Sequence, residues 1–283
     1  MAQNYYHCLV AGLPDIFLDE TEVNFSMLDF KSTLEEELYS EDYELAKLLF
    51  LPYDNKNLLL FLQEKYDQYD ELGNYTLEDF ESELSEGGDL FSLPPYMYQF
   101  VEEYREDRKS KTIKQWENHL TRLFYDYVFS FQDQFLNDWF TFEMNVTNLL
   151  IGLNCREFEK DPEEELIGDN SVTEAISKSS AKDFGLAPVL DYVGQVINIA
   201  DKDNLLAREK SLDQFRWEQL DELTRFQYFS IEVVLAYTIK LQMIYRWMHL
   251  DEATGRKLFE QLIDELKESF EFSKEFMINE QER

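Results

Sequence analysis

The chain has 283 residues, of which 59 are Asp or Glu and 26 are Lys or Arg, so its formal net charge is −33. A field of that sign repels nucleic acid and the anionic surface of a membrane, which excludes both as expected partners. Hydrophobic residues make up 44% and include 23 Phe and 17 Tyr, enough for a large folded core. With only 9 Gly and 6 Pro, the chain has few residues for tight turns. Composition therefore predicts an all-α protein with many helices.

The first third of the chain begins with an apolar segment, 5–13, that ends at Pro14 and lacks the basic flank of a secretory signal. Ser32 or Thr33 is expected to cap the helix that follows, and Pro52 is expected to end the next one. The helices predicted in this part of the chain cover 30–40, 40–51 and 54–69.

A glycine pair at 87–88 and a proline pair at 94–95 mark the first boundary. A helical pattern then extends over 93–158, with apolar residues at spacings of three and four, and we expect a break between 135 and 145. The segment 161–171 is predicted to be a loop and a second boundary. The remaining helices are expected at 187–200, 212–225, 229–248 and 252–276.

These boundaries predict helical lobes at 1–90, 91–165 and 166–283, or a single domain if the lobes pack together. No apolar run approaches the ~18 residues that a spanning helix needs, so we expect a soluble protein. Short internal echoes favour related lobes: DNKNLL at 54–59 resembles NVTNLL at 145–150, and DNLL recurs at 203–206. In a leucine-rich chain such matches arise by chance about as readily as by repetition.

Residues that would support catalysis or metal binding form no recognisable pattern. His7, His119 and His249 lie outside any HExxH motif, and none has a Glu three residues before it. Cys8 and Cys155 form no CxxC pair, so neither a zinc site nor a disulfide framework is expected. The sequence also lacks the glycine-rich loops that cradle phosphates.

The acidic residues leave an enzyme with paired carboxylates open, although no pair stands out. The segment 67–78 resembles an EF-hand loop, but its glycine comes one place late, and Tyr69 and Glu71 occupy ligand positions. A solvated helix–loop–helix corner is the expected structure there. No catalytic, cofactor-binding or metal-binding residue is assigned, and no cofactor is expected.

The segment 228–249, YFSIEVVLAYTIKLQMIYRWMH, carries a family resemblance. It resembles the C-terminal signature of the C-type (also called d-type) stalk subunits of V/A-type ATP synthases, in which Phe-x-Ile/Pro-Glu leads into a helix of form LAYxxxK. Met243 and the run 245–247 depart from the usual pattern. The segments YYHCLVAGLPD and DNKNLLLFL are also similar to a bacterial group of shorter chains whose genes accompany V-type ATPase genes. The matching positions are Phe229, Ile231, Glu232, Leu235, Ala236, Tyr237, Lys240 and Arg246.

The resemblance implies three similar helical lobes arranged as a funnel, seated on the membrane rotor ring and receiving the foot of the central stalk. The expected partners are the central-stalk and rotor-ring subunits of a V/A-type ATPase that transports protons or sodium ions. The expected location is the cytoplasm, at the inner face of the membrane through those subunits, without insertion of this chain. In this interpretation the chain transmits torque and performs no chemistry.

Three residues on the matched helix, Glu232, Lys240 and Arg246, are the expected contact residues. Their alternative roles are helix capping and surface ion pairs worth ~0–1 kcal/mol each. The alternative function is a free-standing acidic helical scaffold or adaptor, whose carboxylates would also favour basic partners. Three lobes around a central opening would favour the connector, and one bundle without an opening would favour the adaptor.

Overall fold

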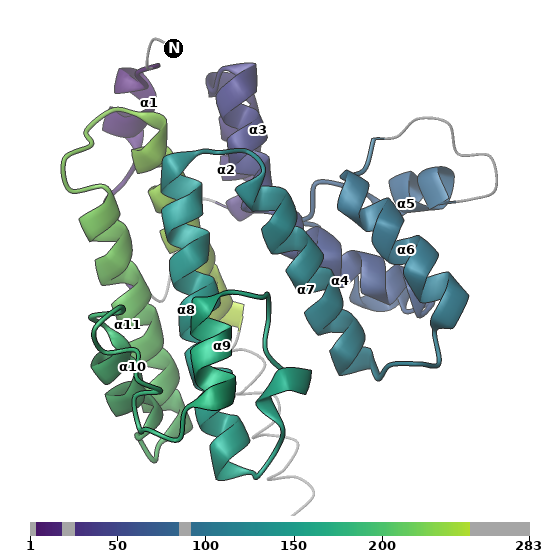
Figure 1. Cartoon of the computed structure of the whole chain (residues 1–283). Helices are drawn as coiled ribbons and strands as arrows, with labels where there is room; N and C mark the ends of the chain where they lie inside the picture. The colour runs from purple at the N-terminus through teal and green to yellow at the C-terminus, as the bar shows by residue number, and fades with distance from the viewer. Residues whose placement is uncertain (1–3, 19–25, 85–91, 250–283) are drawn as a thin grey trace, which may run out of the picture.

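The computed structural model describes residues 4–18, 26–84 and 92–249, and every regular element within these ranges is a helix (Figure 1). The all-α prediction is therefore confirmed. The α-helices are α1 (His7–Gly12), α2 (Met27–Glu37), α3 (Ser40–Leu48), α4 (Leu51–Leu62), α5 (Leu77–Leu84), α6 (Pro95–Asp107), α7 (Ile113–Phe129), α8 (Gln134–Glu157), α9 (Ser171–Lys178), α10 (Val193–Ala200), α11 (Leu205–Leu223) and a helix over 231–249. Two short 3₁₀ helices, η1 (Tyr66–Gln68) and η2 (Pro162–Glu164), follow α4 and α8.

In the first third, α3 begins at Ser40 as predicted, whereas α2 and α4 begin earlier than expected. Ser26, not Ser32 or Thr33, caps α2, because its side chain accepts a hydrogen bond from the Asp29 amide at 2.9 Å. The hydroxyls of Ser32 and Thr33 instead bond carbonyls one turn back within the helix. Pro52 does not end a helix. It lies in the first turn of α4, where its missing N–H leaves no hydrogen bond unmade.

The long pattern over 93–158 forms three helices, α6, α7 and α8. The break expected between 135 and 145 instead lies at 130–133, because Gln132 has a φ of 56° and Asp133 caps α8 through the Leu136 amide at 2.9 Å. A capping box between Thr112 and Gln115 starts α7.

In the last third, α10 begins later than predicted, at Val193, and α11 begins earlier, at Leu205. Asn204 sets the start of α11 by accepting a hydrogen bond from the Ala207 amide at 2.8 Å. The helix expected over 229–248 is present as 231–249, whereas the one expected over 252–276 lies outside the described residues. No helix in the described ranges is both long and apolar enough to cross a membrane.

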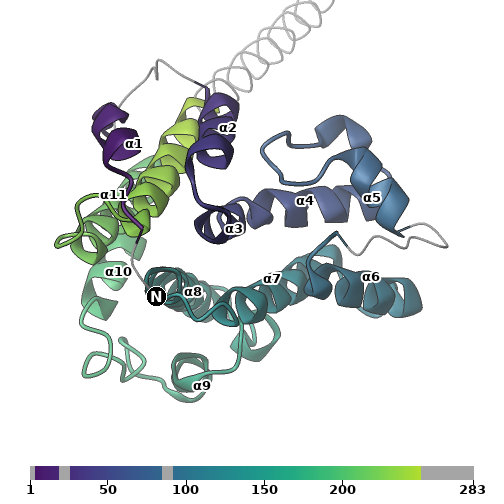
Figure 2. The same ribbon diagram turned by 90° about the horizontal axis from the view of Figure 1, so that it is seen from above.

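The helices form an arm and a body, seen together from above in Figure 2. The arm contains α4 to α7, and the body contains α8 to α11 with the 231–249 helix. Aromatic contacts join neighbouring helices: Phe124 of α7 meets Phe140 of α8 edge-on at 5.4 Å, and Phe142 of α8 meets Phe215 of α11 at 5.1 Å. Such pairs add about 0.5–1.5 kcal/mol each beyond their buried area. The buried side chains form one continuous cluster across arm and body. The division into three lobes stays a prediction.

The echo between 54–59 and 145–150 has a structural counterpart. Asn57, inside α4, donates to the carbonyl of Asp70 and accepts from its amide, both at 2.8 Å. Asn148, inside α8, makes the same two bonds with the carbonyl and amide of Ile167, also at 2.8 Å. Each asparagine therefore fastens the loop that follows its helix. The third echo differs, because Asn204 caps α11 from outside the helix.

Candidate functional site

A cavity of about 1150 Å³ lies between the arm and the body. Its wall is formed by α4, α7, α8, α11 and the 231–249 helix, together with the start of α2 and the loop 68–72. Its lining combines apolar and aromatic side chains with a few charged groups. The lining includes Met27, Leu28, Leu49, Pro52, Tyr53, Lys56, Asp70, Phe124, Trp139, Phe140, Glu143, Asp213, Arg216, Ile239, Met243, Tyr245, Arg246 and His249.

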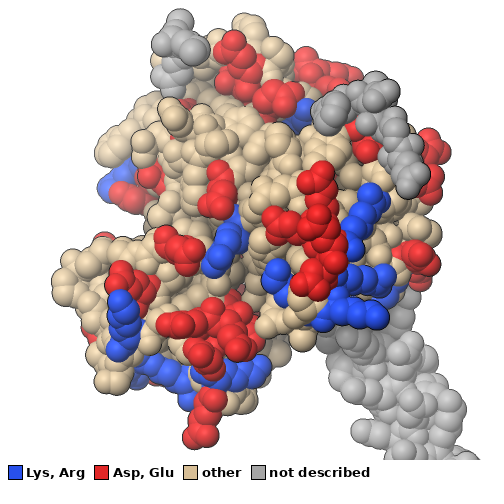
Figure 3. Space-filling view, turned by 45° about the vertical axis from the view of Figure 1, so that its right-hand side comes forward, with Lys and Arg blue, Asp and Glu red and all other residues tan. Residues whose placement is uncertain are grey.

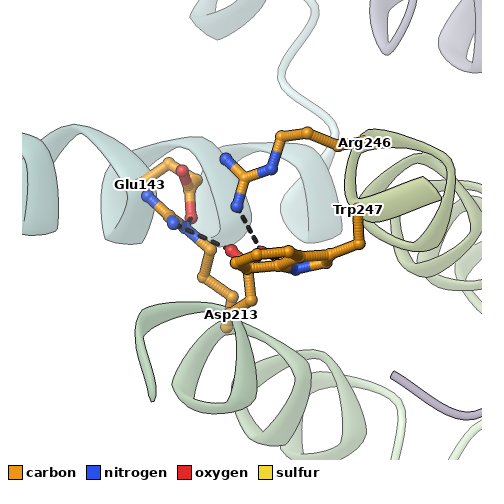
Figure 4. Close-up of polar contacts among 5 residues, drawn as sticks. Glu143, Asp213, Arg246 and Trp247 are labelled. Atoms are coloured by element: carbon orange, nitrogen blue, oxygen red, sulfur yellow. Dashed lines mark hydrogen bonds and ion pairs between the residues drawn. The ribbon is translucent and has the colours of Figure 1, made fainter. Parts of the chain in front are cut away.

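A chain of charged residues forms one wall of this cavity (Figure 4). Arg216 donates from Nε to Glu143 at 2.8 Å and from Nη1 to Asp213 at 3.1 Å. Asp213 is fully buried and also accepts hydrogen bonds from Arg246 Nη2 and, at 2.7 Å, from the indole N–H of Trp247. The network therefore joins the 231–249 helix to α11 through Asp213, and α11 to α8 through Arg216 and Glu143.

The charges of this network offset one another. Burial opposes the positive charge of Arg216, yet the carboxylates of Glu143 and Asp213 raise the pKa of its guanidinium above the ordinary value. Two acids and two arginines make the network neutral overall, which is the condition under which buried charges are tolerated. Arg246 is the member that reaches solvent, because its side chain is 46% exposed at the cavity wall.

A second polar cluster, the Asp54 corner, shapes the loop side of the cavity. Asp54 is fully buried in α4 and accepts hydrogen bonds from the Tyr75 amide at 3.0 Å and the Asn74 side chain at 2.8 Å. Lys31 donates to the carbonyls of Leu72, at 2.9 Å, and Gly73. A Cβ on Gly73 would lie 2.6 Å from the Asp54 carboxylate, so only glycine allows this approach. The helix–loop–helix corner predicted over 67–78 is thus held in place by hydrogen bonds to the buried carboxylate of Asp54.

Burial raises the pKa of Asp54 from 3.8 to about 6, and the hydrogen bonds from Asn74 and Tyr75 oppose this only in part. The pKa of Asp54 is higher in the folded than in the unfolded chain. The stability that its protonation contributes is therefore fully present below pH 3.8 and is lost as the pH rises through about 6. We expect the stability difference between wild type and Asp54→Asn to fall by about 2 kcal/mol over that window. Urea unfolding at intervals from pH 4 to 8 measures it.

The matched control is Asp126→Asn, which removes an exposed carboxylate from α7. Its stability difference from wild type should change little with pH, because water already solvates that group. A flat difference for Asp54→Asn as well would contradict the role given to the buried acid.

The structure separates the three predicted contact residues. Arg246 lies at the cavity, as part of the charged network. Lys240 pairs with Asp221 and lies 4.8 Å from the centre of the Trp217 ring, and its side chain is largely covered. Glu232 lies in the first turn of the same helix, away from the cavity lining.

Several residues that build the site were missed from the sequence. Asp213 and Glu143 are two carboxylates among 59, and nothing in the local pattern of Glu143 marks it as part of a network. A usable signal was present at Asp213, which shares the inward side of α11 with the buried Leu212 and Phe215. Asp54 also follows apolar residues at helical spacing, so the sequence pattern alone indicated that this acid lies on the buried side of its helix.

Surface charges on the described residues are mixed in sign. On the face drawn in Figure 3, acidic side chains lie beside lysines and arginines instead of forming one continuous field. The densest basic run, 105–114, is partly engaged within the chain: Arg105 bonds the carbonyl of Leu84, and Lys111 lies 4.2 Å from the centre of the Trp116 ring.

Fold and cavity together define an all-helical protein in which several helices of the arm and the body border an open cavity. The chain belongs to the family described as "Protein of unknown function (DUF2764)", whose model matches residues 1–270. No curated protein matches the sequence. No solved structure matches the fold.

Proposed function

We propose that this protein is a non-catalytic connector of the central stalk of a V/A-type rotary ATPase, which links the stalk to the membrane rotor ring. The sequence resemblance over 228–249 supports this function, since the matched helix forms one wall of the cavity. In this function the cavity receives a segment of a stalk protein, and the connector passes torque on through its helices. The acidic adaptor is the alternative that the experiment below separates from it.

The observation that carries the proposal is the cavity itself, bordered by α4, α8 and the 231–249 helix. Two of these helices, α4 and α8, fasten their following loops through equivalent asparagines, Asn57 and Asn148. Related helical units around an opening are what a funnel-shaped connector requires.

The cavity lining suits a protein segment as occupant. Apolar side chains such as Met27, Leu28 and Met243 offer surface whose burial gains about 25 cal/mol per Å². Charged groups at the wall, including Lys56 and Arg246, fix orientation more than they add affinity. Binding that depends on such groups weakens as salt screens them.

The test is recovery of ATPase subunits with a tagged copy of this chain from its own cells at low ionic strength. Leu28→Asp places a charge at the cavity wall, where Leu28 is 42% exposed. We expect this variant to recover about ten-fold less of the stalk subunits than wild type. Binding would bury the new carboxylate away from water, and the apolar contact that Leu28 makes with the partner would be lost.

Leu206→Asp is the matched control, since Leu206 is similarly exposed but lies in the first turn of α11, away from the cavity. It should recover stalk subunits as wild type does. Absence of every ATPase subunit from the wild-type sample, or recovery of an unrelated partner instead, would refute the connector and favour the adaptor.

A further inference from the structure

Three helices begin at one end of the molecule, the end that faces the viewer in Figure 2. They are α3, α8 and the 231–249 helix. The N-terminal segment binds this end together, because the Tyr6 amide donates to the carbonyl of Phe229 at 2.6 Å. The Tyr6 hydroxyl in turn donates to Asp42 and accepts from the Tyr39 amide at 3.3 Å.

Four large aromatic side chains on this end are each more than half exposed. They are Tyr5, Tyr39, Phe226 and Tyr228, which we call the aromatic end patch. Tyr39 packs against Tyr6 at 5.9 Å between ring centres, and Tyr5 stacks on His7, which itself contacts Phe229. Phe226 and Tyr228 lie on the segment that leads to Phe229, the residue that the N-terminal segment contacts. Exposed tyrosine and phenylalanine in a group mark interaction surfaces, because each provides a large contact area with little loss of side-chain entropy.

Each of the three helices also carries a carboxylate in or next to its first turn: Asp42, Asp133 and Glu232. Tyr6 brings two of these helix starts together, because its hydroxyl bonds Asp42 and its amide bonds Phe229, just before the helix of Glu232. Burial, together with the charges of Glu232 and Asp42, raises the pKa of Asp133 at the third helix start. None of the ion pairs among the described residues involves these three acids.

The acids differ in how their oxygens are satisfied. Asp133 caps α8, and Asp42 accepts from Tyr6 and from the Asn4 side chain. Glu232 keeps one buried oxygen, Oε2, that has no hydrogen-bond partner in the described part of the chain. Three like charges without a cation repel one another, and an unpaired buried acceptor costs about 1–3 kcal/mol. A lysine or arginine from outside would offset the repulsion among the three carboxylates.

We propose that the aromatic end patch, with Asp42, Asp133 and Glu232 beside it, is a docking surface for a lysine- or arginine-bearing segment of a partner protein. Aromatic faces hold the apolar stem and the cationic head of such a side chain, and the carboxylates neutralise its charge. The surface is separate from the cavity, because none of these residues lines it. The proposal stands whether or not the cavity binds a stalk protein.

The probe is a short fluorescent peptide in which arginine and leucine alternate, and binding to the full chain is followed by fluorescence anisotropy at about 0.15 M salt. A second peptide with glutamine in place of arginine should bind at least about ten-fold more weakly. Phe226→Ser with Tyr228→Ser should weaken binding of the basic peptide about ten-fold, and Glu232→Gln about three-fold. Both aromatic positions are so exposed that these changes leave the core intact.

The matched control joins Val189→Ser, another exposed apolar residue, with the exposed Glu164→Gln. Val189 lies between α9 and α10 and Glu164 lies in η2, so neither belongs to the aromatic end patch. It should change the affinity by less than about two-fold. An equal loss in this control would show that the basic peptide responds only to the overall negative charge, which overturns the proposal. Wild-type affinity in the patch variants would overturn it as well. So would a concentration-dependent dimer by sedimentation that the Phe226→Ser, Tyr228→Ser variant abolishes, since the patch would then bind a second copy.

Discussion

Asp213→Ala should lower the free energy of unfolding by about 3–5 kcal/mol, because it removes the acceptor shared by two arginines and an indole. Arg216 would keep Glu143 as its only carboxylate, while its guanidinium stays largely buried. The hydrogen bond from Trp247 and the ion pair from Arg246 would be lost together. Urea unfolding at pH 7, followed by far-ultraviolet circular dichroism, measures the change.

A matched control lies on the same helix. Asp221 also forms an ion pair, with Lys240, but its side chain is 59% exposed, so Asp221→Ala should cost less than about 1 kcal/mol. Equal losses for Asp213→Ala and Asp221→Ala would contradict the burial of the network.

Asn148→Ala should cost about 2–4 kcal/mol of stability. The amide side chain satisfies both the N–H and the carbonyl of Ile167 in a buried place, and its removal leaves both groups without a partner. Thermal and urea unfolding of the variant give the value, and faster amide exchange at 167 would locate the loss.

The stability losses on replacing the other two asparagines of the repeated segments, Asn57 and Asn204, serve as comparisons for Asn148→Ala. Asn57→Ala should cost less than Asn148→Ala, because its partner Asp70 is only partly buried. Asn204→Ala removes an exposed cap and should cost about 1 kcal/mol. The same small loss at all three positions would show that the asparagines inside α4 and α8 have no special structural role.

The helical class could be predicted because many apolar residues recur at three- and four-residue spacing, most clearly across α7. Helix ends were predicted less well, because each depends on a single capping side chain and several residues nearby in the sequence could serve as the cap. Ser26 competes with Ser32 and Thr33 as a cap, and Pro52 fits both the end of one helix and the first turn of the next. Asp133 was a readable cap, and recognising it would have placed the break correctly.

Most of the site could not be predicted for a different reason. The cavity is formed by residues far apart in the sequence, such as Leu28, Tyr53, Trp139 and Met243, and no local pattern encodes their approach. Arg246 was chosen on a family resemblance and does lie at the cavity, whereas Glu232 and Lys240 lie elsewhere. The pairing of Asp213 with Arg246 joins α11 to a different helix, which periodicity alone cannot reveal.

The position of Arg246 and Trp247 has a mechanical consequence. Both residues lie within the last turn of the described 231–249 helix, and both are held by Asp213 of the neighbouring helix. A force applied through the residues after 249 would thus act first on the contacts of Arg246 and Trp247 with Asp213, before it could separate the 231–249 helix from α11. The load would spread into α11 and, through Arg216 and Glu143, into α8, so that three helices resist in parallel.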